Sequence, residues 1–266
     1  MDISIITTVK NNSLGIFPTI QSVLKQKNYK KIEYIIIDAS TSPKTSMIIK
    51  DLIKNKKVKY IHSKDNNLYD GLNKGIKMAT GKYIGILNSS DIYYDSNVLE
   101  VISKVIKKSD SWNLICGNVI FFNKYEVTRH WKLPIFKNQK IDCLKIPHSS
   151  SFIKRKLLIK NKLYSTNFTI SSDLDFFLRS RKDLDFNTLY INKNLIFMRD
   201  GGLSTSALVA PIKIAEDLCA LFMHYNVFFI FFYFRKILLK FPSFFPKKSD
   251  FFYRELIKRF LELSKK

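Results

Sequence analysis

The chain has 266 residues, of which 46% are hydrophobic, with 22 Phe and 13 Tyr. Apolar surface on this scale can offset the entropy lost on folding, which excludes an intrinsically disordered chain and predicts one sizeable core. The 45 Lys and Arg against 22 Asp and Glu give a formal net charge of +23. This excess fits an anionic partner such as a nucleotide diphosphate, an acidic lipid or a nucleic acid, and it also fits a compositionally biased genome.

The cysteines and histidines do not form a recognisable covalent or metal framework. Cys116, Cys143 and Cys219 are odd in number and far apart, which argues against a disulfide scaffold and for a reducing, cytoplasmic compartment. The four histidines show no zinc-ligand spacing with them. An apolar run starts at residue 3 with no basic region or cleavage site near it, so we expect a first strand and no export signal.

Apolar periodicity predicts alternating strands and helices. Predicted strands cover residues 3–8, 34–38, 58–61, 83–87 and 114–122, and helical stripes cover 17–24, 47–53, 68–79, 99–106 and 173–181. Ser172 stands where an N-cap of the last helix is expected. The alternation predicts an α/β fold with a Rossmann-like, mostly parallel sheet flanked by helices.

Polar residues end several of the predicted strands. Thr7 and Thr8, Asp38, and the run 88–91 are at these ends. Ligands of doubly wound sheets bind beyond the carboxyl ends of the strands. Each of these residues also has an explanation as a helix cap or turn residue, and their shared position makes them candidate binding residues.

The central motif runs from residue 65 to residue 91. It reads D-N-N-L-Y-D-G-L-N-K-G-I, then A-T-G-K-Y-I, then L-N-S-S-D. In order and spacing it resembles the family 2 glycosyltransferases, and within them the colanic acid and exopolysaccharide branch. That branch typically reads D-x-G-I-Y-D-A-M-N-K-G-I, A-x-G-x-Y-I and L-N-S-G-D or L-N-S-D-D. The blocks S-I-I-T-T, I-D-A-S-T, P-H, S-D-L-D-F and G-G-L-S extend the resemblance over residues 3–205.

The resemblance implies a GT-A fold and a metal-dependent, inverting sugar transfer in surface polysaccharide biosynthesis. The donor is a nucleotide sugar, in the first place a UDP-sugar, and the acceptor a saccharide or a lipid-linked molecule. We expect a catalytic domain over residues 1–205, with a nucleotide-sugar-binding half at 1–115 and an acceptor half at 116–205. An aromatic and basic helical tail is expected over 206–266.

Two other activities of similar fold stay open. A sugar nucleotidyltransferase typically opens with a Gly-rich phosphate loop, whereas residues 7–12 read T-T-V-K-N-N. A pseudoenzyme that binds a nucleotide sugar without turnover is the second alternative. A nucleic acid partner is not indicated, because no zinc finger, RRM signature or basic heptad region is recognisable.

Asp91 is the candidate metal ligand. A departing diphosphate develops negative charge that a cation stabilises, and Mn²⁺ or Mg²⁺ commonly binds one or two carboxylates plus substrate phosphates. Asp91 is the only carboxylate of the run 88–91, since Ser90 stands where other members have Gly or Asp, so the site is less acidic. Asn88 and Ser90 are candidate donor-binding residues. The alternative is that Asp91 caps a helix beginning near Ser96.

Further donor contacts follow from the resemblance. Asp38 corresponds to the residue that reads the nucleobase, although Ala39 replaces the usual Gly, and Asp65 to a second nucleoside contact. On the motif helix, Asp70 shares a face with Asn73 and Lys74, which implies contacts to the donor and its diphosphate. An ordinary i,i+4 salt bridge from Asp70 to Lys74 is the alternative.

Asp173 is the candidate general base, with Asp175 in reserve. Direct displacement needs one carboxylate to accept the proton of the acceptor hydroxyl, and a helix N-terminus favours the ionised form. Helix capping is the alternative for either residue. His148 resembles a family position near the donor or acceptor, and a structural role is its alternative.

The tail combines apolar and basic residues. Residues 218–234 are strongly apolar, yet His224 and Asn226 interrupt them, and the run is shorter than a spanning helix needs. Residues 235–266 contain ten Lys or Arg against three acids. We expect the tail to lie on an anionic membrane, at the inner face of the plasma membrane. The alternative is a helical hairpin packed on the catalytic domain or on a second subunit of a homo-oligomer.

Overall fold

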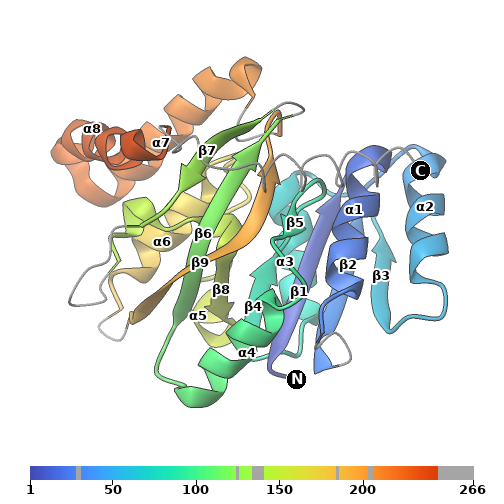
Figure 1. Cartoon of the computed structure of the whole chain (residues 1–266). Coiled ribbons are helices and arrows are strands. Elements are labelled where there is room, and N and C mark those ends of the chain that lie inside the picture. The colour runs from blue at the N-terminus through green and yellow to red at the C-terminus, as the bar shows by residue number, and fades with distance from the viewer. Residues whose placement is uncertain (28–30, 124–125, 134–140, 184–185, 203–205, 245–266) are drawn as a thin grey trace.

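The protein is described from a computed structural model that covers residues 1–27, 31–123, 126–133, 141–183, 186–202 and 206–244. Within these residues one nine-stranded sheet has the order β3-β2-β1-β4-β8-β6-β9-β5, and β7 pairs with β6 (Figure 1). The strands are β1 (Ile3–Val9), β2 (Glu33–Asp38), β3 (Val58–His62), β4 (Tyr83–Ile86), β5 (Ile92–Tyr93), β6 (Leu114–Phe122), β7 (Val127–Trp131), β8 (Ser151–Lys154) and β9 (Thr188–Arg199).

The first half of the sheet is parallel and the second half is mixed. Strands β3, β2, β1 and β4 run parallel, with Ile5 opposite Tyr34 on one side and Gly85 on the other. Strand β8 is antiparallel to both β4 and β6, whereas β6 and β9 are parallel. The predicted α/β fold with flanking helices is confirmed. The antiparallel pairs involve strands β5 to β9, which follow the regular alternation of strands and helices in the first part of the sequence.

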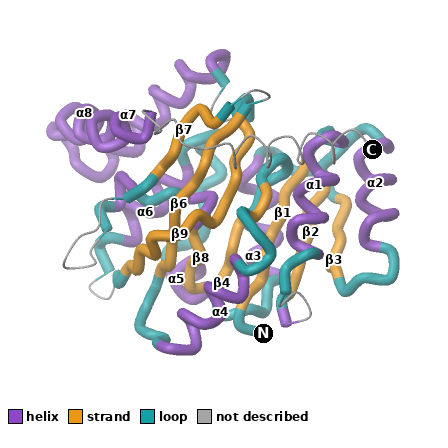
Figure 2. The backbone as a smooth tube through the Cα atoms, in the orientation of Figure 1, coloured by secondary structure: helices purple, strands orange, loops and turns teal. Residues whose placement is uncertain are grey.

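Helices cover both faces of the sheet (Figure 2). The helices α1 (Ser13–Leu24), α2 (Pro43–Ile53) and α4 (Val98–Lys108) pack against one face, in a core that includes Ile5, Ile20 and Ile102. Helices α3 (Leu68–Met78), α5 (Arg155–Lys160) and α6 (Ser172–Ser180) pack against the other. Both faces are therefore shielded from solvent, which is why β1 and β2 are buried at every position.

One detail of the predicted helices is wrong, and one alternative is excluded. Ser172 is the first residue of α6, and Ser171 is its N-cap. Asp91 does not cap the following helix, because the short strand β5 comes directly after it and α4 begins at Val98 with Asn97 as N-cap.

The tail contains α7 (Ala210–Tyr225) and α8 (Phe229–Lys240), joined by the 3₁₀ turn η5 (Asn226–Phe228). The two helices pack on each other at the end of the molecule opposite α2 (Figure 1). Tyr225 stacks on Phe232 across the turn, with ring centroids 3.5 Å apart. Helix α7 also contacts α6, so the hairpin arrangement expected as an alternative is present.

A polar cluster lies at the amino ends of the strands. Glu33 accepts hydrogen bonds from Ser4 Oγ, from Lys59 Nζ at 2.5 Å and from Thr80 N at 2.7 Å. Burial raises the pKa of Glu33, but these hydrogen bonds outweigh burial and hold the pKa at about 2. Gly81 N donates to Ser4 Oγ at 2.8 Å, which brings the loop before β4 against the backbone of β1.

Gly81→Ala should destabilise the fold. An added Cβ would lie 2.5 Å from Ser4 N and 2.7 Å from Ile3 C, so the backbone of β1 or β4 must move. Overpacking of this kind costs about 1–3 kcal/mol. Urea denaturation should show a lower midpoint, while Gly202→Ala, where a Cβ meets nothing within 4 Å, should not. Equal midpoints for the two variants would contradict this account of the packing.

Candidate functional site

The carboxyl ends of β1, β2 and β4 meet through polar side chains. Thr8 Oγ1 donates to Asn88 Oδ1 at 3.2 Å, and Asn11 Oδ1 accepts from Thr41 N and Ser42 N, each at 2.9 Å. Thr7 lies on the opposite face of β1, where it is buried against Tyr34 with its Oγ1 3.1 Å from the phenol oxygen. Thr8 and Asn88 are thus at this edge, whereas Thr7 supports the strand below it.

The turn 88–91 is held in an unusual backbone conformation. Ser90 has a φ of +85°, which a residue with a Cβ seldom adopts, and this explains why Gly suits the same position of the motif. Ser90 N donates to Gly15 O at 3.2 Å and to Thr19 Oγ1 at 3.0 Å. Asn12 Nδ2 donates to Ser90 Oγ at 3.0 Å. The amino end of α1 therefore fixes the turn that precedes Asp91.

Asp91 is a buried carboxyl group at the end of this turn. Asp91 is 4% exposed. Burial raises the pKa of its carboxyl group to about 8, although a backbone hydrogen bond from Arg199 lowers the pKa. Where the chain is described, no group of three or more His, Cys, Asp or Glu side chains is placed so that it could hold a metal ion. A buried carboxyl with no basic side chain as partner fits a divalent cation whose other ligands are donor phosphates and water.

Asp38 is fully buried, and both its oxygens accept hydrogen bonds. Oδ1 accepts from Ser40 N at 2.9 Å, and Oδ2 accepts from Ser46 Oγ at 2.6 Å and Tyr60 OH at 2.8 Å. Although burial raises it, these bonds hold the pKa of Asp38 below its usual value. In this arrangement Asp38 shapes the loop after β2, and its carboxylate is buried from solvent.

Asp65, Asp70 and Lys74 form one charged cluster. Lys74 Nζ lies 2.6 Å from Asp65 Oδ1 and 3.4 Å from Asp70 Oδ2, and it also donates to Lys64 O at 2.8 Å. The i,i+4 pair of Asp70 and Lys74 is thus present. It is part of a larger set of contacts that holds the loop after β3 against α3.

Asn73 and other polar residues of α3 bind the loop 164–170. Asn73 Nδ2 donates to Tyr164 O at 2.8 Å and Asn73 Oδ1 accepts from Tyr164 N at 3.1 Å. Tyr69 OH donates to Ile170 O at 2.5 Å, and Asn67 Nδ2 donates to Thr166 O at 2.8 Å. The motif helix therefore joins the edge of the first four strands to the segment that leads into α6.

Asp173 lies in the first turn of α6 beside a group of aromatic residues. It is half-buried, and its carboxylate adds to the effect of burial in raising the pKa of both Tyr69 and Tyr164. His148 Nε2 lies 2.8 Å from Tyr164 OH. Burial lowers the pKa of His148, against the opposing effect of Asp173, so a neutral imidazole is favoured here.

Asp175 has a different environment from Asp173. It is 3% exposed, and it binds Arg179 Nε at 2.9 Å and His224 Nε2 of α7 at 3.0 Å. Although burial raises it, these contacts hold the pKa of Asp175 below its usual value. Two residues along a helix correspond to a rotation of about 200°, so Asp175 faces α7, away from the side of Asp173.

The sequence did not indicate how α7 supports α6. The carboxylate of Glu216 accepts three backbone N–H groups, from Thr169 and Ile170 at 2.7 Å each and from Ser171 at 2.9 Å. Asp217 Oδ1 accepts from Ser171 Oγ at 2.8 Å. Both acids lie in a tail without a recognisable motif, so no sequence signal pointed to them.

A family model described as glycosyl transferase family 2 matches residues 4–172. An uncharacterized glycosyltransferase of Rickettsia bellii is 32% identical over 108 residues, which are 41% of this chain and 15% of that protein. The matched segment thus spans a small part of that relative.

Two solved structures share the fold. S. aureus TarS 1-349 in complex with UDP-GlcNAc has a TM-score of 0.66 at 15% identity, covering 99% of this chain and 72% of that one. A mannosyltransferase from Pyrobaculum calidifontis in complex with GDP-Man and Mn²⁺ has a TM-score of 0.65 at 10% identity, covering 99% and 80%. These likenesses confirm the fold predicted from the sequence.

Asp91→Asn should stabilise the metal-free protein, and more at pH 8 than at pH 5. The pKa of Asp91 is about 8 in the folded state and about 4 in an unfolded chain, so between these pH values the unfolded chain releases the proton that the folded state still holds, and the stability of the fold decreases as the pH rises. Melting temperatures in EDTA should therefore fall between pH 5 and pH 8 more for the wild type than for the variant. Asp51→Asn, at an exposed position of α2, is the control. Parallel pH profiles for wild type and Asp91→Asn would contradict the burial of a protonated carboxyl.

Proposed function

Because the chain belongs to glycosyl transferase family 2, we propose that it transfers a sugar, with inversion, from a nucleotide-sugar donor to an acceptor hydroxyl. The observation that carries this proposal is the contrast between two neighbouring carboxylates. Asp175 is held between Arg179 and His224, whereas Asp173 is half-buried at the start of α6, and within the described residues its carboxylate has one hydrogen bond, from the N–H of Leu174 at 2.8 Å. Asp173 is therefore the carboxylate that can receive a proton.

In the proposed reaction, the acceptor oxygen bonds to the anomeric carbon as the bond from that carbon to the diphosphate breaks. Asp173 takes the proton of the acceptor hydroxyl, and the nucleoside diphosphate leaves with the electron pair of the broken bond. Asp173 lies in the first turn of α6, at the positive end of the helix dipole. Near it, His148 and Tyr164 bind each other.

The donor is proposed to lie at the carboxyl ends of β1, β2 and β4. Thr8, Asn88 and Ser90 would face it directly, while Thr7 and Asp38 would shape the nucleoside end from below. Asp65, Asp70 and Lys74 would form its side wall, and Asn73 would tie that wall to the acceptor side. We propose a UDP-sugar, a choice supported by the UDP-GlcNAc bound to one structure of the same fold.

Asp91 is the residue proposed to hold Mn²⁺ or Mg²⁺. The chemistry supplied by such a cation, when bound, is positive charge beside the leaving diphosphate. A structure of the same fold contains Mn²⁺ together with a nucleotide sugar, which supports the use of a divalent metal.

The acceptor is proposed to be a saccharide or a lipid-linked intermediate of surface polysaccharide biosynthesis, used at the cytoplasmic face of the membrane. Donor class and activity can be tested together. UDP-, GDP-, dTDP- and CMP-sugars should each be added with Mn²⁺, and a true donor should raise the melting temperature because it binds the folded state. Release of the nucleoside diphosphate should follow for that donor alone. No shift and no release with any member of the panel would contradict the proposed function.

Asp173→Asn should retain donor binding and lose about a hundredfold to ten-thousandfold in turnover, the usual contribution of a positioned acid or base. Calorimetry and initial rates measure the two effects. Asp175→Asn should instead lower the melting temperature, because it disturbs the contacts to Arg179 and His224. If Asp175→Asn keeps its stability yet abolishes transfer, while Asp173→Asn is active, the base is misassigned.

Mn²⁺ should raise the melting temperature of the wild type in the presence of UDP, and this increase should disappear in Asp91→Asn. The physical reason is that the variant lacks the one carboxylate proposed to bind the cation. Turnover should be lost in EDTA and should return with added Mn²⁺. Asp51→Asn should behave as the wild type. An undiminished Mn²⁺ effect in Asp91→Asn would remove Asp91 from the metal site.

A further inference from the structure

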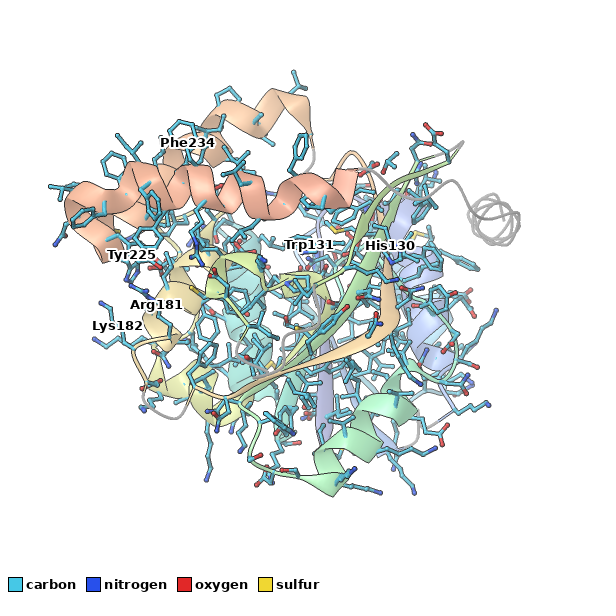
Figure 3. All side chains as sticks on the ribbon, turned by 60° about the vertical axis from the view of Figure 1, so that its left-hand side comes forward. His130, Trp131, Arg181, Lys182, Tyr225 and Phe234 are labelled. Carbon is cyan, nitrogen blue, oxygen red and sulfur yellow. The ribbon has the colours of Figure 1, made fainter. Side chains whose placement is uncertain are left out.

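Helix α8 has its polar and apolar faces reversed relative to an ordinary surface helix. Its exposed apolar residues recur at helical spacing and form a single stripe: Ile230, Phe231, Phe234, Ile237, Leu238 and Phe241. On the inner face, Lys236 is 5% exposed and its Nζ lies 2.5 Å from Asp217 Oδ2. Figure 3 shows Phe234 on the side of α8 that points away from the sheet.

The turn of the hairpin extends this apolar surface. Val227 and Phe228 in η5 are 77% and 67% exposed, and Phe222 and Met223 at the end of α7 are also exposed. Together with the stripe on α8 they form one outer surface, which we call the apolar face of the hairpin. A contiguous apolar surface of this kind typically meets a membrane or another protein.

The hairpin has the composition of a membrane helix but not its geometry. Residues Ala210–Ser243 include an 18-residue window with a mean hydropathy of 1.5, enough by length and composition to cross a bilayer. The helix is interrupted at Asn226, however, where φ is +49°. Helices α7 and α8 have 16 and 12 residues. A spanning helix needs about 20 residues. Contacts of Glu216, Asp217 and His224 also hold α7 on α6, so the hairpin lies along the catalytic domain.

A basic pocket opens where the hairpin meets the catalytic domain. It has a volume of about 510 Å³, and its described lining includes Lys145, Arg181, Arg235 and the acid Asp142. Arg235 Nη2 lies 2.5 Å from Asp142 Oδ2. The guanidinium of Arg181 stands 4.1 Å from the ring centroid of Tyr225. Arginine in such a pocket suits the oxygens of a phosphate group.

The pocket and the apolar face share the same short segment of chain. Tyr225 and Phe232 line the pocket, while Phe228 and Phe231 beside them are exposed. In Figure 3, Arg181 and Tyr225 lie at the end of the hairpin where α7 turns into α8. A phosphate in the pocket would therefore lie next to side chains that favour lipid.

We propose that the apolar face of the hairpin docks into the interface of an anionic bilayer and that the pocket of Lys145, Arg181 and Arg235 binds the phosphate of an anionic lipid. The occupant is a lipid because aromatic side chains border the pocket and the chain carries a large positive charge. This inference deepens the membrane placement in the proposed function and rests on it.

Flotation of the full chain with vesicles tests the proposal. The wild type should float with vesicles of phosphatidylcholine and phosphatidylglycerol and bind pure phosphatidylcholine vesicles more weakly. The double variant Arg181→Gln/Arg235→Gln should bind anionic vesicles about thirtyfold more weakly, because two interfacial cations are removed. Its matched control, Lys107→Gln/Lys108→Gln, removes two exposed cations from α4 and should bind as the wild type. Phe231→Ser/Phe234→Ser should lose binding to both vesicle types.

Several outcomes would overturn the inference. Wild-type flotation by the Arg181→Gln/Arg235→Gln variant removes the lipid-phosphate pocket. A wild type that ignores all vesicles, and whose dimer by light scattering disappears in Phe231→Ser/Phe234→Ser, assigns the apolar face to a second copy. A rise in melting temperature with inorganic phosphate but no flotation assigns the pocket to a free anion. Circular dichroism establishes that each variant is folded, and donor binding measured without vesicles separates these failures from failure of the proposed function.

Discussion

One carboxylate, that of Glu216, supports the start of α6 by accepting three backbone N–H groups. The first N–H groups of a helix and of the loop before it have no partners within the helix, and a buried donor without a partner costs free energy. Helix α7 supplies the partner and, through His224 and Asp175, contacts α6 again one turn later. The position of Asp173 therefore depends on the tail, and the tail in turn is held by the catalytic domain.

Helix α3 has the same connecting role on the donor side. Its motif combines residues with two tasks. Lys74 binds Asp65 and Asp70 and so fixes the loop after β3, while Asn73 binds both backbone groups of Tyr164. The pattern that predicts donor binding therefore also holds the two halves of the chain together.

The hairpin shows how a surface can be apolar and still belong to a well-ordered protein. Lys236 and Asp217 compensate each other where they are buried, so the inner face of α8 carries charge without leaving it unpaired. The outer stripe stays exposed. A basic pocket beside that stripe gives an amphipathic surface in which cations border aromatic side chains, the arrangement that suits an anionic bilayer.

The sequence by itself determined the α/β fold, the strands β1 to β4 and the family, because apolar runs and stripes repeat with the periods of strands and helices and because the motif from residue 65 to residue 91 is local. It also brought Thr8, Asn88 and Asp91 into one region, since parallel strands end at one edge. Only the tertiary structure distinguished Asp173 from Asp175, buried Asp38 among three donors, and showed that Glu216 holds α6. These outcomes depend on which side chains fill the space around a carboxylate. Some of these partners lie far away in the sequence, as Tyr60 does for Asp38, His224 for Asp175 and Thr169 for Glu216, and no local pattern encodes them.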